Sequence, residues 1–219
     1  MPARRTIDLA LYLVTDPELC RAHGVAETVR AAVAGGVTAV QLRDKTSERG
    51  DVYETALALK AALDGSGVPL IVNDHVDIAM AVGAEGVHVG QTDMPPEVVR
   101  RLVGPDVAIG FSTHNEAEIA RLDPDIVDYA GLGPFWPTGT KANASPALTA
   151  AGRAPALRRL IPVPTVAIGG ITADRVPDAM AAGVEGVAVV SAICGTPDPQ
   201  AAARALRQAV DRARERQDA

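Results

Sequence analysis

The chain has 219 residues, 47% of them hydrophobic and 22% charged, which suits a globular protein whose core is large enough for one α/β barrel. The net charge of −6 argues against a nucleic-acid-binding protein, because proteins of that class are more often basic. Two cysteines, Cys20 and Cys194, offer neither a disulfide framework nor metal-ligand spacing, so we expect a reducing, cytoplasmic location.

Short apolar runs alternate with alanine-rich helical segments along the whole chain. The first run, 9–15, is short and has no cleavage-like site after it, so we interpret it as a strand and not as a signal peptide. The other predicted strands are 37–42, 69–73, 86–90, 107–111, 126–132, 165–170 and 186–191, and a last helix is predicted over 197–216. No run approaches the roughly 18 apolar residues of a membrane helix, so no membrane partner is predicted.

An internal repeat supports a closed ring of such units. AMAVGAEGVHVG (79–90) and AMAAGVEGVAVV (179–190) are nearly identical, and AAVAGGVTAV (31–40) is a third version. Each combines a helix end, a glycine turn and a buried strand, and strands that alternate with helices form parallel sheets. Eight evenly spaced units favour a (β/α)₈ TIM barrel over a doubly wound open sheet. We predict one domain, 1–219, with the barrel between about residues 9 and 210.

Chemistry in such barrels takes place at the C-terminal ends of the strands. Gln41 and Arg43 share one face of the second strand, because strand side chains alternate, and Lys45 follows just beyond it. An amide and two cations at the mouth of a barrel would suit an anionic group. The alternative is that this segment is only a solvated, charged loop.

Two carboxylates follow neighbouring strands, Asp74 after the third and Asp93 after the fourth. They suggest a site for Mg²⁺, which takes one or two carboxylates and completes its shell with water and phosphate oxygens. The alternative is that each aspartate caps the helix that begins beside it.

Two further segments point to phosphate. PTGTK (137–141) carries two hydroxyls and a lysine but lacks the nucleotide P-loop spacing, and it could be an ordinary turn. Gly169 and Gly170 end the seventh strand, where barrels often bind phosphate through backbone N–H groups, and Ser191 lies on the next loop. Phe135 and Trp136 could wall a pocket for a flat ring or pack beneath their loop.

The histidines are less informative. His88 lies within a strand and is interpreted as a core or rim residue. His114 precedes a predicted helix, which it would cap unless it lines the mouth of the barrel.

The motifs QLRDK, IVND, GVHVGQTD, GFSTH, PTGTK, AIGGI and VVS, in this order and spacing, resemble the thiamine-phosphate synthase family over about residues 9–210. The resemblance implies a Mg²⁺-dependent transferase. Its substrates would be 4-amino-5-hydroxymethyl-2-methylpyrimidine diphosphate and 4-methyl-5-(2-phosphooxyethyl)thiazole, and its products thiamine phosphate and pyrophosphate. The implied reaction is dissociative, through a pyrimidinylmethyl cation.

The resemblance also implies a role for each matching residue. The pyrimidine diphosphate would be held by Gln41, Leu42, Arg43, Asp44, Lys45, Asn73, Ser112 and Lys141, among which Arg43, Lys45, Ser112 and Lys141 would be catalytic. Asp74 and Asp93 would bind Mg²⁺, and Thr138, Gly139, Thr140, Gly170, Val190 and Ser191 would hold the thiazole phosphate. One departure is KANASPALT (141–149), which follows the PTGT loop where the family often has a more acidic segment.

Two alternatives compete with this assignment. A thiazole tautomerase of the same barrel group would need acid–base residues, with His114 a candidate, and no metal. A non-catalytic barrel that binds phosphorylated ligands would tolerate the loss of Asp74 or Asp93, and both are present. The expected partners are therefore two small phosphorylated heterocycles and no nucleic acid, and the sequence indicates no particular oligomeric state.

Overall fold

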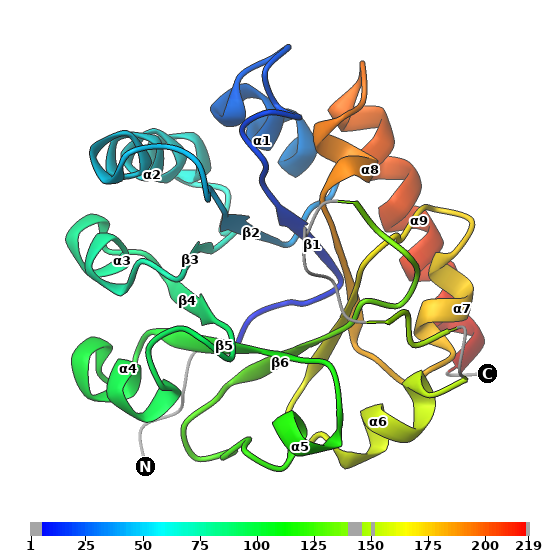
Figure 1. Ribbon diagram of the computed structural model, residues 1–219. Coiled ribbons are helices and arrows are strands. Elements are labelled where there is room, and N and C mark those ends of the chain that lie inside the picture. Colours follow the sequence, from blue (N-terminus) through cyan, green and yellow to red (C-terminus); the bar gives the residue numbers. More distant parts are fainter. Residues whose placement is uncertain (1–5, 140–145, 150–151, 218–219) are drawn as a thin grey trace.

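The computed structural model describes residues 6–139, 146–149 and 152–217. Eight parallel strands form a closed barrel in chain order, in which each strand pairs with the next and β8 pairs with β1. Helices surround the strands as an outer ring (Figure 1). The predicted (β/α)₈ TIM barrel is therefore confirmed, and the open-sheet alternative is wrong because the first and last strands are hydrogen-bonded neighbours.

The elements follow the predicted alternation closely. The strands are β1 Leu11–Val14, β2 Ala39–Leu42, β3 Leu70–Asn73, β4 Gly86–Val89, β5 Ala108–Thr113, β6 Tyr129–Leu132, β7 Thr165–Ile168 and β8 Gly186–Val189. The helices are α1 Val25–Ala34, α2 Arg49–Leu63, α3 Val76–Val82, α4 Pro96–Val103, α5 Glu116–Ile119, α6 Ala154–Leu160, α7 Val176–Met180, α8 Ser191–Cys194 and α9 Pro199–Gln217. Within the three described ranges, no helix is long and apolar enough to cross a membrane.

Alternation along each strand divides the buried residues into two layers. In β1, Tyr12 and Val14 belong to the cluster inside the barrel, whereas Leu11 and Leu13 belong to the larger cluster between the strands and the helices. Because both faces of each strand are covered, the strands are mostly apolar on both sides, and most polar side chains of the site lie at the strand ends.

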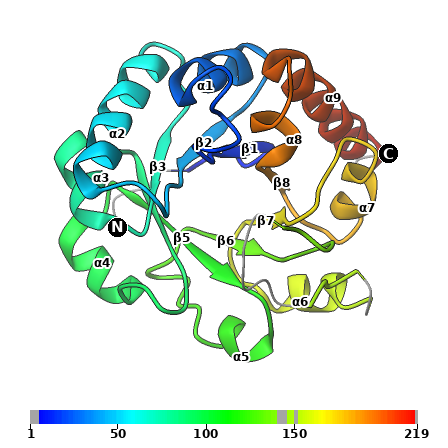
Figure 2. The ribbon, with the colours of Figure 1, turned by 45° about the horizontal axis from the view of Figure 1, so that its top comes forward.

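The C-terminal helix completes the ring at the seam between β8 and β1. Helix α9 contacts both α1 and α7, so the last element of the chain lies beside the first helix (Figure 2). The apolar side chains that α9 buries include Leu206 and Val210, which anchor it against the barrel.

Gly186 at the start of β8 permits this closure. A Cβ atom at this position would lie 1.8 Å from the carbonyl oxygen of Leu9, which belongs to the backbone and cannot rotate away. We expect Gly186→Ala to lower the free energy of unfolding by at least about 1–3 kcal/mol, the usual cost of overpacking, as measured by urea denaturation. Gly50→Ala is the matched control, because nothing lies within 4 Å of its added Cβ. Equal stability of the two variants would contradict the prediction.

Candidate active site

A cavity of about 490 Å³ opens at the C-terminal ends of the strands. All eight strands, or the loops that follow them, contribute to its wall. Of the residues predicted to act in the site, those that line this cavity are Gln41, Arg43, Lys45, Asn73, Asp74, Asp93, Ser112, Thr138, Gly170, Val190 and Ser191. Residues separated by up to 150 positions in the chain therefore meet in one space, as the barrel prediction requires.

The remaining predicted residues lie elsewhere. The side chain of Leu42 is in the core between strands and helices, because it has the opposite parity to Gln41 and Arg43. The carboxylate of Asp44 accepts hydrogen bonds from the backbone of Thr46 and Ser47, at 2.9 and 3.0 Å, and so shapes the loop after β2. The positions of the Leu42 and Asp44 side chains therefore do not favour contact with a substrate. Gly139 is not among the residues that line the cavity, and Thr140 and Lys141 fall outside the described residues.

The cationic side chains after β2 face the cavity. Thr15, which is fully buried, holds the backbone of Arg43 in place: its Oγ1 accepts from the Arg43 N–H at 3.1 Å and lies 3.4 Å from the Arg43 carbonyl oxygen. Lys45 forms an ion pair with Asp74, which follows the neighbouring strand β3. The segment is therefore more than a solvated loop, because its two cations line the cavity and one of them reaches the next strand end.

Asp74 and Asp93 lie against each other. Burial raises the pKa of Asp74, and the neighbouring Asp93 carboxylate raises it further, against the opposing effect of Lys45. The backbone of Asp74 has a φ of 62°, a left-handed conformation that is uncommon outside glycine and that occurs preferentially at functional sites. Two carboxylates are thus held together where their mutual repulsion would be relieved by a cation.

The capping alternative for these two aspartates is wrong. Helix α3 has His75 at its N-cap and α4 has Pro95, and neither helix has a side-chain cap hydrogen bond. Asp93 instead accepts from the backbone N–H of Gly90 at 2.8 Å, which fixes the turn after β4.

The carboxylate pair fits Mg²⁺ by its chemistry. Both ligands would be hard oxygen donors, and no group of three His, Cys, Asp or Glu side chains suited to a metal occurs in the part of the chain that the structure describes. A cation there would complete its shell with water and substrate oxygens, which is the usual pattern for Mg²⁺.

The wall formed by the loops after β6 and β7 depends on two glycines. Gly169 and Gly170 have φ values of 102° and 64°, and a Cβ on Gly170 would lie 2.8 Å from the carbonyl oxygen of Pro137. The Gly169 carbonyl accepts from the Trp136 N–H at 3.0 Å. Glycine is therefore needed here for the close approach of the two loops, and it leaves the Gly170 backbone open to the cavity.

The two aromatic residues of this loop pack beneath it. Phe135 is fully buried in the outer core, and Trp136 packs against the same core. The guanidinium of Arg175 lies 5.3 Å from the Trp136 ring centre and donates to the Gly170 carbonyl at 2.7 Å. Of the two interpretations of these aromatics, the packing role is confirmed.

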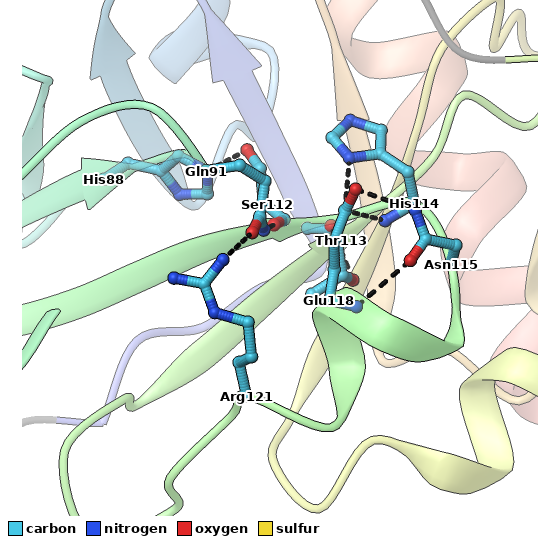
Figure 3. Close-up of polar contacts among 9 residues, drawn as sticks. His88, Gln91, Ser112, Thr113, His114, Asn115, Glu118 and Arg121 are labelled. Carbon is cyan, nitrogen blue, oxygen red and sulfur yellow. Dashed lines mark hydrogen bonds and ion pairs between the residues drawn. The ribbon is translucent and has the colours of Figure 1, made fainter. Parts of the chain in front are cut away.

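The rim after β5 carries a polar cluster (Figure 3). His114 lines the mouth, where its Nδ1 lies 2.7 Å from the Glu118 carboxylate, and Asn115 rather than His114 caps α5. Gln91 donates to the Ser112 carbonyl at 2.7 Å and accepts from Arg121 at 3.2 Å. The backbone of Ser112 is therefore supported from the neighbouring strand end. Glu118 was not predicted, although its i,i+4 spacing from His114 is a usable signal.

The floor of the cavity contains polar residues that the sequence interpretation missed. Tyr12, Tyr129 and His88 are buried, and His88 Nε2 lies 2.9 Å from the Ser112 hydroxyl. His88 was interpreted as a core or rim residue, and it is both buried and part of the cavity lining. The sequence did contain a signal for this cluster. Tyr12 and Tyr129 each lie in a strand, and a tyrosine hydroxyl that is buried there needs a hydrogen-bond partner.

Comparisons of the sequence and the fold with known proteins identify the family. Residues 11–193 match the family model described as thiamine monophosphate synthase. The thiamine-phosphate synthase of Xanthobacter autotrophicus is 51% identical over 96% of this chain and 99% of its own, and that of Azorhizobium caulinodans is 48% identical over 94% and 97%. The structure of thiamine phosphate pyrophosphorylase from Pyrococcus furiosus superimposes with a TM-score of 0.84 at 33% identity, covering 94% of this chain and 97% of that one. The chain therefore belongs to the thiamine-phosphate synthase family.

Proposed function

We propose that the protein joins 4-amino-5-hydroxymethyl-2-methylpyrimidine diphosphate to 4-methyl-5-(2-phosphooxyethyl)thiazole in this cavity, with release of pyrophosphate. Synthesis of thiamine phosphate is the activity of the relatives that match nearly the full chain, and it makes the protein a transferase. The observation that carries the proposal is the arrangement of charge: two cations after β2 and two carboxylates after β3 and β4 converge on one cavity.

The diphosphate would lie between these groups. Arg43 and Lys45 supply positive charge from one strand end, and Asp74 and Asp93 would hold Mg²⁺ at the next two. When bound, Mg²⁺ would neutralise part of the charge on the diphosphate oxygens. The role of Lys141 in the same task is carried over from the family resemblance alone.

The residues present suit a dissociative reaction. Charge that builds on the departing pyrophosphate is stabilised by fixed positive groups, which is an electrostatic route to rate enhancement. The thiazole nitrogen carries a lone pair and needs no deprotonation before it captures the pyrimidinylmethyl cation. The reaction therefore needs no nucleophile–base pair from the protein.

The thiazole phosphate would occupy the other wall. Gly170, Val190, Ser191 and Thr138 line the cavity at the ends of β6, β7 and β8, across the barrel from the carboxylates. Backbone N–H groups beside Gly170 and the Ser191 hydroxyl are suitable donors for a phosphate monoester.

The activity is tested by incubating the purified protein with both substrates and Mg²⁺, then oxidising the product to fluorescent thiochrome. We expect a signal that requires both substrates and is abolished by EDTA and restored by added Mg²⁺. An isomerase of the same barrel group would form no thiamine phosphate, so the absence of any metal-dependent signal would reject the proposal.

The thiazole-phosphate assignment has its own test. We expect Ser191→Ala to raise the KM for the thiazole phosphate about tenfold or more, the scale of a lost hydrogen bond to a charged group, because its hydroxyl would face that phosphate. The KM for the pyrimidine diphosphate should change little and serves as the internal control. Equal effects on the two KM values would contradict the assignment.

A further inference from the structure

A chain of hydrogen-bonded side chains runs along the cavity floor from β2 to β5. Gln41 Nε2 donates to the Tyr12 hydroxyl at 2.9 Å, and the hydroxyls of Tyr12 and Tyr129 are 2.8 Å apart. The Tyr129 hydroxyl lies 3.1 Å from His88 Nδ1, and His88 Nε2 lies 2.9 Å from Ser112 Oγ, as Figure 3 shows for the last pair. Gln41, Tyr12, His88 and Ser112 all line the cavity, whereas Tyr129 connects them from behind.

The barrel interior makes room for this chain. A Cβ atom on Gly110 would lie 2.2 Å from Tyr129 Cζ and 2.4 Å from His88 Nδ1, so only glycine permits their contact. The Tyr12 and Tyr129 rings are tilted at 60° with centres 5.9 Å apart, and both belong to the core inside the barrel. Tyr129 is 2% exposed, so its hydroxyl can influence a ligand only through its neighbours.

The hydrogen atoms in the chain can be assigned from one end to the other. The Tyr12 oxygen accepts from Gln41, and every donor in the chain is satisfied when the Tyr12 O–H donates to Tyr129 and the Tyr129 O–H donates to His88 Nδ1. In this arrangement His88 carries its proton on Nε2 and donates to Ser112 Oγ. This leaves the Ser112 O–H as a donor toward the cavity and Gln41 Oε1 as an acceptor.

The surroundings of the two tyrosines favour their protonated forms. Burial raises the pKa of both Tyr12 and Tyr129, and the contact with Tyr12 raises that of Tyr129 further. Both hydroxyls therefore keep their protons at neutral pH and remain able to donate.

We infer that this chain fixes the donor and acceptor pattern of the cavity floor, so that Tyr129 and His88 act as positioning residues that select an aminopyrimidine over its oxo counterpart. The inference rests on the proposed function, because it takes the pyrimidine as the ligand of Gln41. An amino group donates to Gln41 Oε1, whereas an oxo group would bring two acceptors together. Binding of the oxo compound would require the Gln41 amide to turn over, which breaks or reverses the whole chain.

The test uses Tyr129→Phe, which keeps the ring and removes the hydroxyl. Without it, the Tyr12 O–H is free to donate to Gln41, and the amide can present its N–H₂ to an oxo group. For wild type and variant we would measure the KM of the amino substrate and the inhibition constant of 5-hydroxymethyl-2-methyl-4-oxopyrimidine diphosphate. We expect the preference for the amino compound to fall about tenfold, the scale of one hydrogen bond, while the KM for the thiazole phosphate stays constant.

Tyr53→Phe is the matched control, because Tyr53 lies on α2 and is not part of the hydrogen-bonded chain. The amino-over-oxo preference of this variant should equal that of wild type. Tyr12→Phe interrupts the chain at a second point and should lower the preference in the same way. If Tyr129→Phe does not fold, the amino-over-oxo preference of Tyr12→Phe alone tests the inference.

An unchanged amino-over-oxo preference in the folded variants would overturn the inference, as would an equal rise in the KM of both substrates. The proposed function is judged separately, by whether wild-type protein forms thiamine phosphate. If it forms none, the same preference is measured by calorimetric binding of the two diphosphates.

Discussion

Replacement of Asp93 by asparagine is expected to lower kcat about 10²-fold or more, the scale observed when one preorganised electrostatic group is removed. The change removes the charge of one of the two carboxylates that would hold Mg²⁺. The amide oxygen of asparagine can still accept from the Gly90 N–H, so the turn after β4 keeps its support. The loss would therefore report on the carboxylate charge, and kcat should be measured across a Mg²⁺ titration by the thiochrome assay.

Asp77→Asn is the matched control for this variant. Asp77 lies on the neighbouring helix α3, its side chain is 62% exposed, and its partner is Arg49 on the surface. It should retain wild-type turnover and Mg²⁺ dependence. Near-normal turnover of Asp93→Asn at saturating Mg²⁺ would remove Asp93 from the metal site.

Replacement of Arg43 by alanine is expected to have an effect of similar size on kcat, about 10²-fold or more. Arg43 lines the cavity, and Thr15 holds its backbone in place, so the side chain starts from a fixed point at the rim. Such a group stabilises the charge that develops as the pyrophosphate leaves more than it stabilises the bound substrate. Arg43→Lys should recover part of the rate, since it restores charge without the planar guanidinium.

Arg49→Ala is the control for the loss of an arginine beside the same loop. Its guanidinium is 62% exposed and pairs with Asp77, and surface pairs of this kind contribute little. Unchanged kcat in Arg43→Ala, or an equal loss in Arg49→Ala, would contradict a specific role for Arg43. Thermal unfolding of both variants should match wild type.

Much of this architecture was predictable from local patterns. Apolar runs with a period of two, separated by helical segments and glycine turns, indicated parallel strands, and their number and even spacing indicated a barrel. Once strands are parallel, their C-terminal ends share one edge, so the convergence of Arg43, Asp74 and Ser112 on one cavity followed from their positions after the strands. The resemblance over nearly the whole chain added the reaction, which no single pattern contains.

Other features could not be predicted because they depend on which distant residues meet. The sequence allowed Asp74 and Asp93 to be helix caps, and only the structure brings their carboxylates together beside Lys45. It likewise left open whether Phe135 and Trp136 wall a pocket, and packing places them beneath the loop. In these cases the local pattern is compatible with two structures, and long-range contacts decide between them.

The sequence by itself determined the order of the strands, the face of each strand on which a side chain lies, and the end of the barrel where polar groups collect, because these depend on local periodicity and chain direction. The tertiary structure alone decided which of those groups touch. Tyr12 and Tyr129 are 117 positions apart, and their hydroxyls meet only because the closed barrel brings β1 and β6 across a shared interior. Hydrogen bonds act over about 3 Å, so partners are selected by the final packing and not by the pattern that produced it.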